Sequence, residues 1–371
     1  MKGLRFSLSR IEAYVLRHTL SGIAAALAVI AFMIVLINFV ELSRTLGGRV
    51  KDLSPGLTLS LTLMQSPSVI LILFPFAFLW GVQAAFVNLN RRSELIAMRA
   101  AGISAWRFIF PAAAASALLG VVTVLALNPI ASALNGEFQR REAAIENAFM
   151  GDSTKPVWLR QGDGRTQVII LGRTLVKGLG VDLKDVSLFR YAVRPDGHLD
   201  FRQRVDAQEA VLKNHQWLLT GARSAEPGSQ SESYGAYAIP SPLDEHTALE
   251  KVAGAASVPF WGLPGMIART EGAGFSATSY RLQFDQLLAT PLMYAGMAVL
   301  AAAFSLRLMR LGGMAQLMAS AIVLGFLIFF LNQFCFSLGR ADVIPPLFAA
   351  WTPPLLALLA GFTLLCYTED G

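Results

Sequence analysis

The residues best suited to a specific interaction lie in the segment 91–104, where one carboxylate stands among arginines and small apolar side chains. Residues 93–101 are mostly good helix formers, and Gly102 can adopt the positive φ that ends a helix. One face, at spacings i, i+3, i+4 and i+7, would carry Glu94, Ala97, Met98 and Ala101. The pattern predicts a short helix that docks in a groove of a partner protein, where Glu94 reaches an arginine or a backbone amide. The alternative is an interfacial helix whose arginines contact lipid headgroups.

The motifs of several enzyme classes are missing from the sequence. No lysine follows a glycine, so the G-x-x-x-x-G-K-[ST] loop that cradles nucleotide phosphates is absent. Neither the G-x-S-x-G turn of hydrolases nor the H-E-x-x-H zinc motif occurs. No metal-ligand spacing relates the four histidines, His18, His198, His215 and His246. We therefore expect no cofactor, no metal site and no catalytic residue.

The elements that must position the segment 91–104 are six long stretches without Lys, Arg, Asp or Glu. Each reaches the roughly 20 apolar residues that span a bilayer core as a helix. They are residues 20–40, 53–90, 108–136, 286–306, 311–339 and 343–368. With 54% hydrophobic and 15% charged residues, the chain is predicted to be an integral membrane protein. Buried helices of a soluble protein are the alternative, but these are usually shorter and keep a polar stripe.

Two of these stretches need further interpretation. The first has 21 residues, more than the usual signal-peptide core of about 7–15 residues, so we expect a membrane span. The second contains the turn-forming sequence Ser54-Pro55-Gly56 and is too long for one upright span. It is predicted to hold an interfacial lead-in before about Ser66 and a span from there to about Leu89.

Ionisable side chains are almost absent from the six stretches, although ion-coupled transporters usually keep such groups near mid-membrane. The polar candidates there are amides: Asn38, Gln83, Asn332 and Gln333. If the chain moves a substrate, the energy is expected to come from a partner.

Basic residues are distributed unevenly between the two sides of the predicted spans. One side receives ten, Lys2, Arg5, Arg10, Arg17, Arg91, Arg92, Arg99, Arg107, Arg307 and Arg310. The short loops of the other side receive four, Arg44, Arg49, Lys51 and Arg340. By the positive-inside rule, both termini and the segment 91–104 are predicted to be cytoplasmic. The long insert after the third span would then lie outside the cytoplasm.

The insert, residues 137–285, holds 17 basic and 18 acidic residues, so no basic surface for nucleic acid is expected. Its pattern is one of short strands separated by turn residues. Strands and hairpins are predicted at residues 157–171, 186–191 and 208–220. The Gly-, Ser- and Pro-rich stretch 224–241 is predicted to form loops. Strands at this spacing favour a sandwich or a jelly roll.

The sequence thus predicts an α-helical membrane protein with six transmembrane helices and an extracytoplasmic antiparallel β-domain of jelly-roll type. Residues 1–134 would hold the first three transmembrane helices and a short cytoplasmic helix at about 91–102. Residues 135–277 would form the β-domain, and residues 278–371 the last three transmembrane helices. Cys335 and Cys366 lie in the fifth and sixth spans, so no disulfide is expected in the insert.

The segment around Glu94 resembles the LptF/LptG permeases of the lipopolysaccharide exporter. The pattern Arg-x-Ser-Glu-Leu-x-x-Met-x-x-x-Gly-x-Ser runs from Arg91 to Ser104. Further matches are Phe74-Pro75, Leu79-Trp80-Gly81, Pro129 and Ile344-Pro345-Pro346. The resemblance covers essentially the whole chain. Two segments, Phe39–Leu42 and Val157–Arg160, look more like LptG than LptF.

This resemblance implies partners and site residues. Two such permeases, LptF and LptG, would pair on a dimer of the ATPase LptB and pass lipopolysaccharide towards the relay protein LptC. A coupling helix at 91–102 would contact the ATPase through Arg92, Glu94, Met98 and Arg99. The lipid cavity or its gate would be lined by residues of the first and fifth spans, Ile34, Asn38, Ile322, Phe326 and Phe329.

One position departs from the family pattern. Asn38 stands where LptG relatives can carry a lysine suited to a lipid A phosphate, and a neutral amide brings no charge. Arg44, Arg49 and Lys51 in the following loop could contact the phosphate instead. The alternative is that these three are solvated loop charges.

The function implied by the resemblance is that of an LptG-type permease subunit, not an enzyme. It would extract lipopolysaccharide from the bacterial inner membrane with energy from the partner ATPase. The paralogous LptF subunit is the nearest alternative. Two other classes stay open: a membrane enzyme acting on lipid-linked glycans, although the spans lack a carboxylate pair for acid–base catalysis, and a permease that regulates an external hydrolase.

Overall fold

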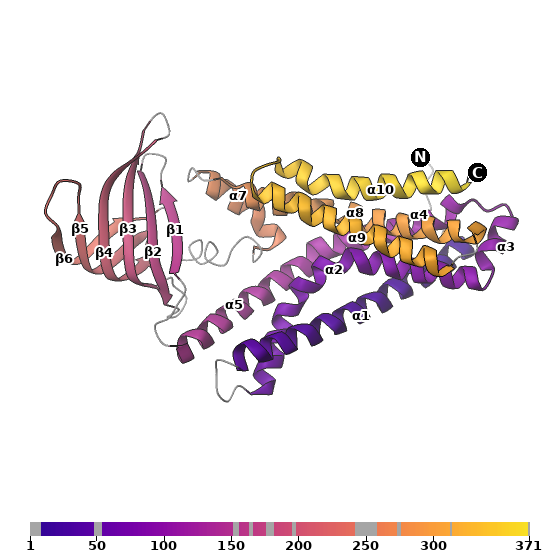
Figure 1. Cartoon of the computed structure of the whole chain (residues 1–371), viewed down its shortest axis with the longest axis horizontal. Coiled ribbons are helices and arrows are strands. Elements are labelled where there is room, and N and C mark those ends of the chain that lie inside the picture. Colours follow the sequence, from indigo (N-terminus) through magenta and orange to yellow (C-terminus); the bar gives the residue numbers. More distant parts are fainter. Residues whose placement is uncertain are drawn as a thin grey trace, which may run out of the picture. The chain divides into compact units, whose positions relative to one another are not determined.

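The computed structural model describes residues 9–47, 54–150, 156–162, 166–175, 182–194, 198–241, 258–272, 276–311 and 314–369. The chain divides into two compact units. The first gathers Met1–Val40, Gln65–Ala131 and Arg281–Gly371, and the second gathers Glu41–Met64 and Ser132–Tyr280. The first unit is helical, and the second contains the β-sheet (Figure 1).

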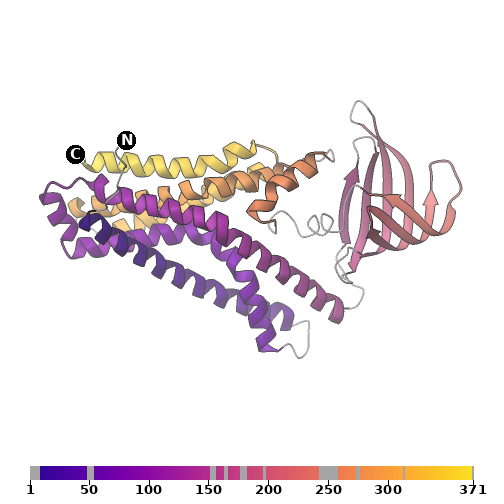
Figure 2. The ribbon, with the colours of Figure 1, turned by 180° about the vertical axis from the view of Figure 1, so that it is seen from behind.

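Six apolar helical segments in the described ranges are long enough to cross a membrane. They are α1 (Arg10–Gly47), α2 (Pro55–Arg91), α4 with η1 and α5 (Ala105–Val122, Thr123–Leu127 and Asn128–Met150), α8 (Thr278–Leu311), α9 (Met314–Arg340) and α10 (Pro346–Glu369). The prediction of six membrane helices is confirmed, and the chain is a multi-pass membrane protein (Figure 2).

α2 is one continuous helix from Pro55 to Arg91, without a break at Ser66 between the predicted lead-in and the predicted span. The turn-forming sequence lies at its start, where the Ser54 hydroxyl caps the first turn and Pro55 takes the first helical position. Pro67 and Pro75 lie inside the helix. Membrane helices tolerate such prolines because neighbouring groups satisfy the freed backbone carbonyls.

α1 and α2 approach each other through two glycines. A Cβ atom on Gly81 would lie 2.4 Å from the Cα atom of Ile23, and one on Gly22 would lie 2.3 Å from the carbonyl oxygen of Gly81. Small residues permit such backbone contact between membrane helices. α2 also packs on α8, where Phe78 stacks on Tyr294 with ring centroids 4.2 Å apart. Phe78 and Tyr294 belong to the cluster of buried residues that forms the main core of the helical unit.

The third span contains a π-helical segment, Thr123–Leu127, between α4 and α5. Just before it, Gly120 packs against α8, since a Cβ atom there would lie 2.5 Å from the Cα atom of Pro291. The side chain of the buried Tyr294 also lies beside Thr123. The spans that precede and follow the β-sheet in the sequence are therefore in direct contact.

The described part of the second unit contains a six-stranded antiparallel sheet in which every strand pairs with its neighbours in the sequence. Its strands are β1 (Pro156–Gly162), β2 (Thr166–Leu175), β3 (Asp182–Val193), β4 (Leu199–Lys213), β5 (Gln216–Ala225) and β6 (Glu232–Pro240). The predicted antiparallel β-domain is confirmed, including the β1–β2 and β4–β5 hairpins. Asn214 and His215 turn β4 into β5 with φ angles of 49° and 58°, as a two-residue hairpin loop requires.

The prediction that residues 224–241 form loops is wrong for most of this stretch. β6 occupies Glu232–Pro240 and pairs with β5 from Gln216 to Ser224. Of the β6 residues only Ile239 is fully buried. Backbone hydrogen bonds to β5 hold this edge strand. Its amino-acid composition therefore does not need the apolar alternation by which a strand is predicted from sequence.

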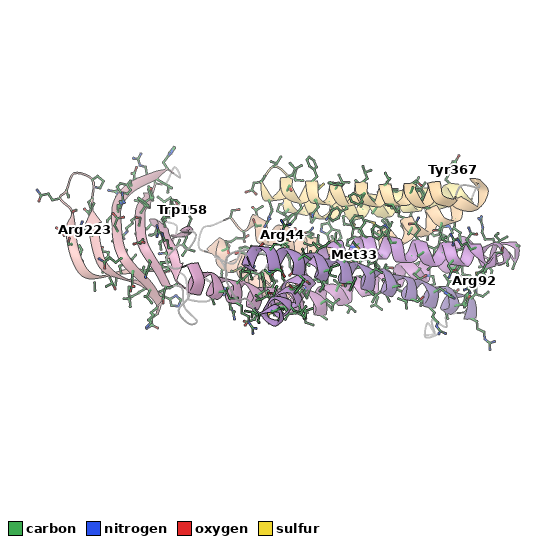
Figure 3. The ribbon with its side chains drawn as sticks, turned by 60° about the horizontal axis from the view of Figure 1, so that its bottom comes forward. Met33, Arg44, Arg92, Trp158, Arg223 and Tyr367 are labelled. Atoms are coloured by element: carbon green, nitrogen blue, oxygen red, sulfur yellow. The ribbon has the colours of Figure 1, made fainter. Side chains whose placement is uncertain are left out.

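One face of the sheet is closed around Trp217. This side chain is fully buried and donates its Nε1 hydrogen to Oε1 of Gln161 at 3.1 Å. The hydroxyl of Ser241 donates to the same oxygen at 2.7 Å. Trp158 and Arg223, labelled in Figure 3, are exposed. Successive side chains along the strands thus point alternately to a packed face and to an exposed face of the sheet.

Candidate functional site

The short helix α3 (Glu94–Ala100) forms within the segment 91–104, as predicted. It ends in a Schellman motif, in which Gly102 (φ +78°) donates its amide hydrogen to the Arg99 carbonyl at 2.9 Å. Ile103 donates to the Met98 carbonyl at 3.1 Å. The positive φ at Gly102 is the reason that this position suits glycine.

Glu94 begins α3 and is half-buried. The side chain of Tyr14 on α1 lies beside its carboxylate. Its Oε2 atom is enclosed and has no hydrogen-bond partner among the residues that the structure describes. An enclosed carboxylate oxygen without a donor is unfavourable. Glu94 is therefore a residue of α3 whose carboxylate would gain from one more donor.

The other predicted coupling residues lie close by in the chain. Arg92 is exposed, and Met98 and Arg99 are half-buried. Leu95 is fully buried and belongs to the same core cluster as Val15 of α1. Leu95 therefore anchors α3 to the helical unit.

The exposed side of α3 is shifted by one residue from the predicted face. It carries the exposed residues Ser93, Ile96, Ala97 and Ala100. Ile96 keeps 48% of its surface exposed, which is unusual for a large apolar side chain next to a packed helix. Leu95 and Ile96 are both apolar, and only one of two adjacent residues can face the core. An apolar exposed side of this kind suits contact with another protein.

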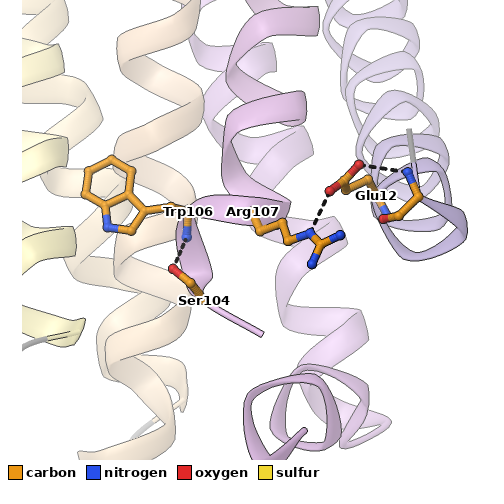
Figure 4. A network of polar contacts seen from close by, with 5 residues as sticks. Glu12, Ser104, Trp106 and Arg107 are labelled. Carbon is orange, nitrogen blue, oxygen red and sulfur yellow. Dashed lines mark hydrogen bonds and ion pairs between the residues drawn. The ribbon is translucent and has the colours of Figure 1, made fainter. Parts of the chain in front are cut away.

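A second polar cluster joins the start of α1 to the start of α4 (Figure 4), and the Ser9-x-x-Glu12 spacing of a capping box is its sequence signal. Arg107 donates its Nε hydrogen to Oε1 of Glu12 at 2.9 Å. Glu12 also forms a capping box with Ser9: the Ser9 amide donates to Oε2 at 2.8 Å, and the Glu12 amide donates to the Ser9 hydroxyl at 3.3 Å. Ser104 caps α4 by accepting the Trp106 amide hydrogen at 3.3 Å. A cavity of about 70 Å³ here is lined by Ser9, Ile11, Glu12, Ile103, Arg107 and Phe108.

Several predicted gate residues of α1 and α9 gather around Phe76 of α2. Ile34 is buried in a cluster with Phe76, and the Phe329 ring centroid lies 4.9 Å from that of Phe76. The Phe326 ring lies 5.4 Å from Phe76 and stays 46% exposed. Ile322, one turn before Phe326 on α9, is also exposed. The structure therefore brings Ile34, Phe326 and Phe329 together.

Asn38 points into the helical unit, where its side-chain amide donates to the Ser66 hydroxyl of α2 at 3.3 Å. The exposed side of α1 instead carries Val29, Phe32, Met33, Leu36, Ile37 and Val40. Met33 is labelled in Figure 3. In the most apolar stretch of α1 only 17% of residues are buried, and in α9 22%, the lowest values among the six described spans. These two helices therefore leave the largest apolar faces for lipid or another protein to cover.

Of the residues predicted to contact phosphate, the structure describes Arg44. Arg44 lies in the last turn of α1 and is exposed. Arg49 and Lys51 lie outside the described residues. Within the described ranges, no three His, Cys, Asp or Glu side chains come together as metal ligands.

Two comparisons with known proteins cover nearly the whole chain. A family model described as "Lipopolysaccharide export system permease LptF/LptG" matches residues 13–367. The curated protein "Lipopolysaccharide export system permease protein LptG" of Haemophilus influenzae is 24% identical over 376 residues. That alignment covers 98% of this chain and 100% of the relative.

Proposed function

Since this chain belongs to the LptF/LptG family of lipopolysaccharide export permeases, we propose that it is the LptG-type permease subunit of an ATP-driven exporter. The observation that carries the proposal is its end-to-end similarity to a protein named as an LptG permease. The segments Phe39–Leu42 and Val157–Arg160, which look more like LptG than LptF, add support.

The energy for transport comes from a separate ATPase dimer of the LptB type, because this sequence has no nucleotide-binding loop. α3 is the coupling helix on which that ATPase docks. The exposed side of α3 offers small apolar groups for packing, and Glu94 offers an oxygen that has no donor within the described ranges. The side chains of Arg92, Met98 and Arg99 complete the contact.

The uncovered faces of α1 and α9 support pairing with an LptF-type permease, such that the two chains enclose lipopolysaccharide. Acyl chains contact the side chains gathered near Phe76, namely Ile34, Asn38, Ile322, Phe326 and Phe329. Arg44, Arg49 and Lys51 contact the lipid phosphates. The β-domain passes the lipid to an LptC-type relay protein.

The mechanism is mechanical. ATP binding closes the ATPase dimer, α3 moves with it, and the gate helices change their packing around the lipid. Such coupling requires that each state of the ATPase favour a different packing of the spans. The protein is placed in the bacterial inner membrane, with both termini and α3 in the cytoplasm. The ten-to-four distribution of basic residues supports this orientation, in which the β-domain, residues 135–277, lies in the periplasm.

The proposal is tested with a photoreactive amino acid at position 326 or 33 in the complex purified through a tag on this chain. Both side chains are exposed in the apolar region of the spans, and Phe326 touches Phe76. We expect an LptB-type ATPase and an LptF-type permease to co-purify, and lipopolysaccharide to crosslink at both positions until ATP is added.

The matched control is the same amino acid at Leu118 of α4, which is 65% exposed but lies on neither uncovered helix. Equal, ATP-independent labelling at all three positions would contradict a lipid cavity on α1 and α9. A co-purified paralogue of the LptG type would assign this chain to the LptF position instead.

A further inference from the structure

The first turns of α1 are built to present a fixed carboxylate. The capping box between Ser9 and Glu12 holds the Glu12 side chain against the backbone, and that side chain is only 16% exposed. Its remaining oxygen, Oε1, accepts the Nε hydrogen of Arg107. Because the carboxylate is already oriented, little side-chain freedom remains to be lost when Arg107 binds.

Arg107 follows α3 after a short, well-defined connection. The Schellman motif at Gly102 ends α3, and Ser104 caps α4 two residues later. Since the cap follows the motif so closely, no long flexible loop separates the end of α3 from Arg107. A displacement of the end of α3 is therefore carried to the Arg107–Glu12 contact and so to α1.

The start of α3 is fastened to the same turn of α1. The Tyr14 side chain lies beside the carboxylate of Glu94, the first residue of α3, and the Tyr14 ring meets the His18 ring edge-on at 4.6 Å. One residue further on, Val15 is fully buried in the core cluster that contains Leu95. α3 is thus attached to α1 at its start by Tyr14 and beyond its end by Glu12.

α1 has a backbone pivot beyond these contacts. Gly22 meets Gly81 of α2 so closely that neither could carry a Cβ atom without displacing backbone. From Tyr14 to Gly22 the helix rises about 12 Å, and from Gly22 to Asn38 about 24 Å. A rigid helix tilting at Gly22 would therefore move its Asn38 end about twice as far as its Tyr14 end. Among the described residues, the Asn38 side chain is held by burial and by a neutral hydrogen bond to Ser66.

We propose that Glu12 and Tyr14 are positioning residues that join α1 to α3, so that a displacement of α3 tilts α1 about the Gly22–Gly81 contact. The inference rests on the proposed function in taking α3 as the site where an ATPase applies force. The contacts of Glu12 and Tyr14 and the Gly22–Gly81 pivot all lie within this one chain. The exposed apolar side of α1 is what such a tilt would open or close.

Charge reversal tests the Glu12–Arg107 contact. In the complete complex, Glu12→Arg and Arg107→Glu are each expected to lower ATP-driven lipopolysaccharide extraction roughly fivefold or more, while the ATPase still co-purifies. The double exchange restores opposite charges and should recover most of the activity. Tyr14→Phe removes the hydroxyl beside Glu94 and should lower extraction in the same way. Singles that match the unsubstituted complex, or a double exchange no better than the singles, would overturn the inference.

Two variants serve as matched controls. Glu137→Gln breaks an ion pair with Arg141 that stays within α5, at 2.8 Å. Tyr367→Phe removes a hydroxyl from a tyrosine that is 74% exposed near the end of α10. Both are expected to leave extraction unchanged, because neither takes part in the Glu12, Tyr14 or Gly22 contacts.

A distance measurement separates this inference from the proposed function. Spin labels are placed at Ile37 of α1 and Leu355 of α10, both exposed, in a chain whose two native cysteines are replaced. In the chain without partners, Glu12→Gln combined with Tyr14→Phe is expected to broaden the distance distribution, because α1 loses both attachments to α3. An unchanged distribution overturns the inference whatever the lipid assay shows. A complex that extracts no lipid overturns the proposed function. The distance distribution of the chain without partners then still decides whether Glu12 and Tyr14 hold α1.

Discussion

Glu94→Lys is expected to abolish ATP-driven lipid release while the chain still inserts with its six spans. The carboxylate lies beside Tyr14, and its Oε2 has no donor among the described residues. A lysine cannot accept a hydrogen bond at this position and adds a second cation next to Arg92. A hydrogen bond to a charged group contributes about 1.5–3 kcal/mol. Since 1.4 kcal/mol is a tenfold change, we expect the ATPase to bind roughly thirtyfold more weakly or worse.

The measurement is binding of the purified ATPase dimer, followed by lipid release from vesicles that contain the complex. Glu94→Gln keeps the shape and one acceptor, so it should fall between the lysine variant and the unsubstituted chain. Glu209→Lys makes the same charge change at an exposed position of β4 and should alter neither result. Normal ATPase binding together with normal lipid release in Glu94→Lys would refute α3 as the docking helix.

The second large effect is expected at the crossing of α1 and α2. Alanine normally stabilises a helix by about 1 kcal/mol relative to glycine. At Gly81 the added Cβ would lie 2.4 Å from the Ile23 Cα and 2.6 Å from the Ile23 amide nitrogen. These are backbone atoms, so the helices must separate, and overpacking of this kind costs typically about 1–3 kcal/mol, occasionally more. We expect Gly81→Ala to lose about 2 kcal/mol of stability, measured as a lower melting temperature in detergent.

Gly56→Ala is the matched control, because it makes the same change near the start of the same helix, where no atom lies within 4 Å of the new Cβ. Its melting temperature should equal or exceed that of the unsubstituted chain. If Gly81→Ala melted like Gly56→Ala, the backbone contact between α1 and α2 would not exist, and the pivot proposed for α1 would be lost with it.

Much of the fold follows from patterns that extend over short distances in the sequence. An uncharged run of about 20 residues has few alternatives to a membrane helix, and all six runs form helices. Asn214-His215 between two alternating segments predicts a tight hairpin, and both residues take positive φ. The glycine stop at Gly102 has the same local cause. The family resemblance, stated first on the residues around Glu94, is confirmed over residues 13–367.

The features that sequence patterns could not predict depend on pairing between distant residues. β6 is a strand because β5 offers it a backbone edge, although its own residues are those of a loop. The run 55–91 is one helix because the surrounding helices accommodate Pro67 and Pro75. Glu12 and Arg107 lie 95 positions apart, and no spacing rule relates them. Tyr14 and Glu94 are likewise joined only by the folded helices.

The whole account depends on α3 and the β-sheet lying on opposite sides of the membrane, since an ATPase stroke on one side must move lipid towards the other. The most direct test places a single cysteine at Ala97 of α3 or at Leu218 of β5, both exposed, in a chain without its native cysteines. A membrane-impermeant thiol reagent added to spheroplasts should label position 218 at once. Position 97 should be labelled only after the membrane is opened. Labelling of both positions in intact spheroplasts, or of neither, would contradict the account.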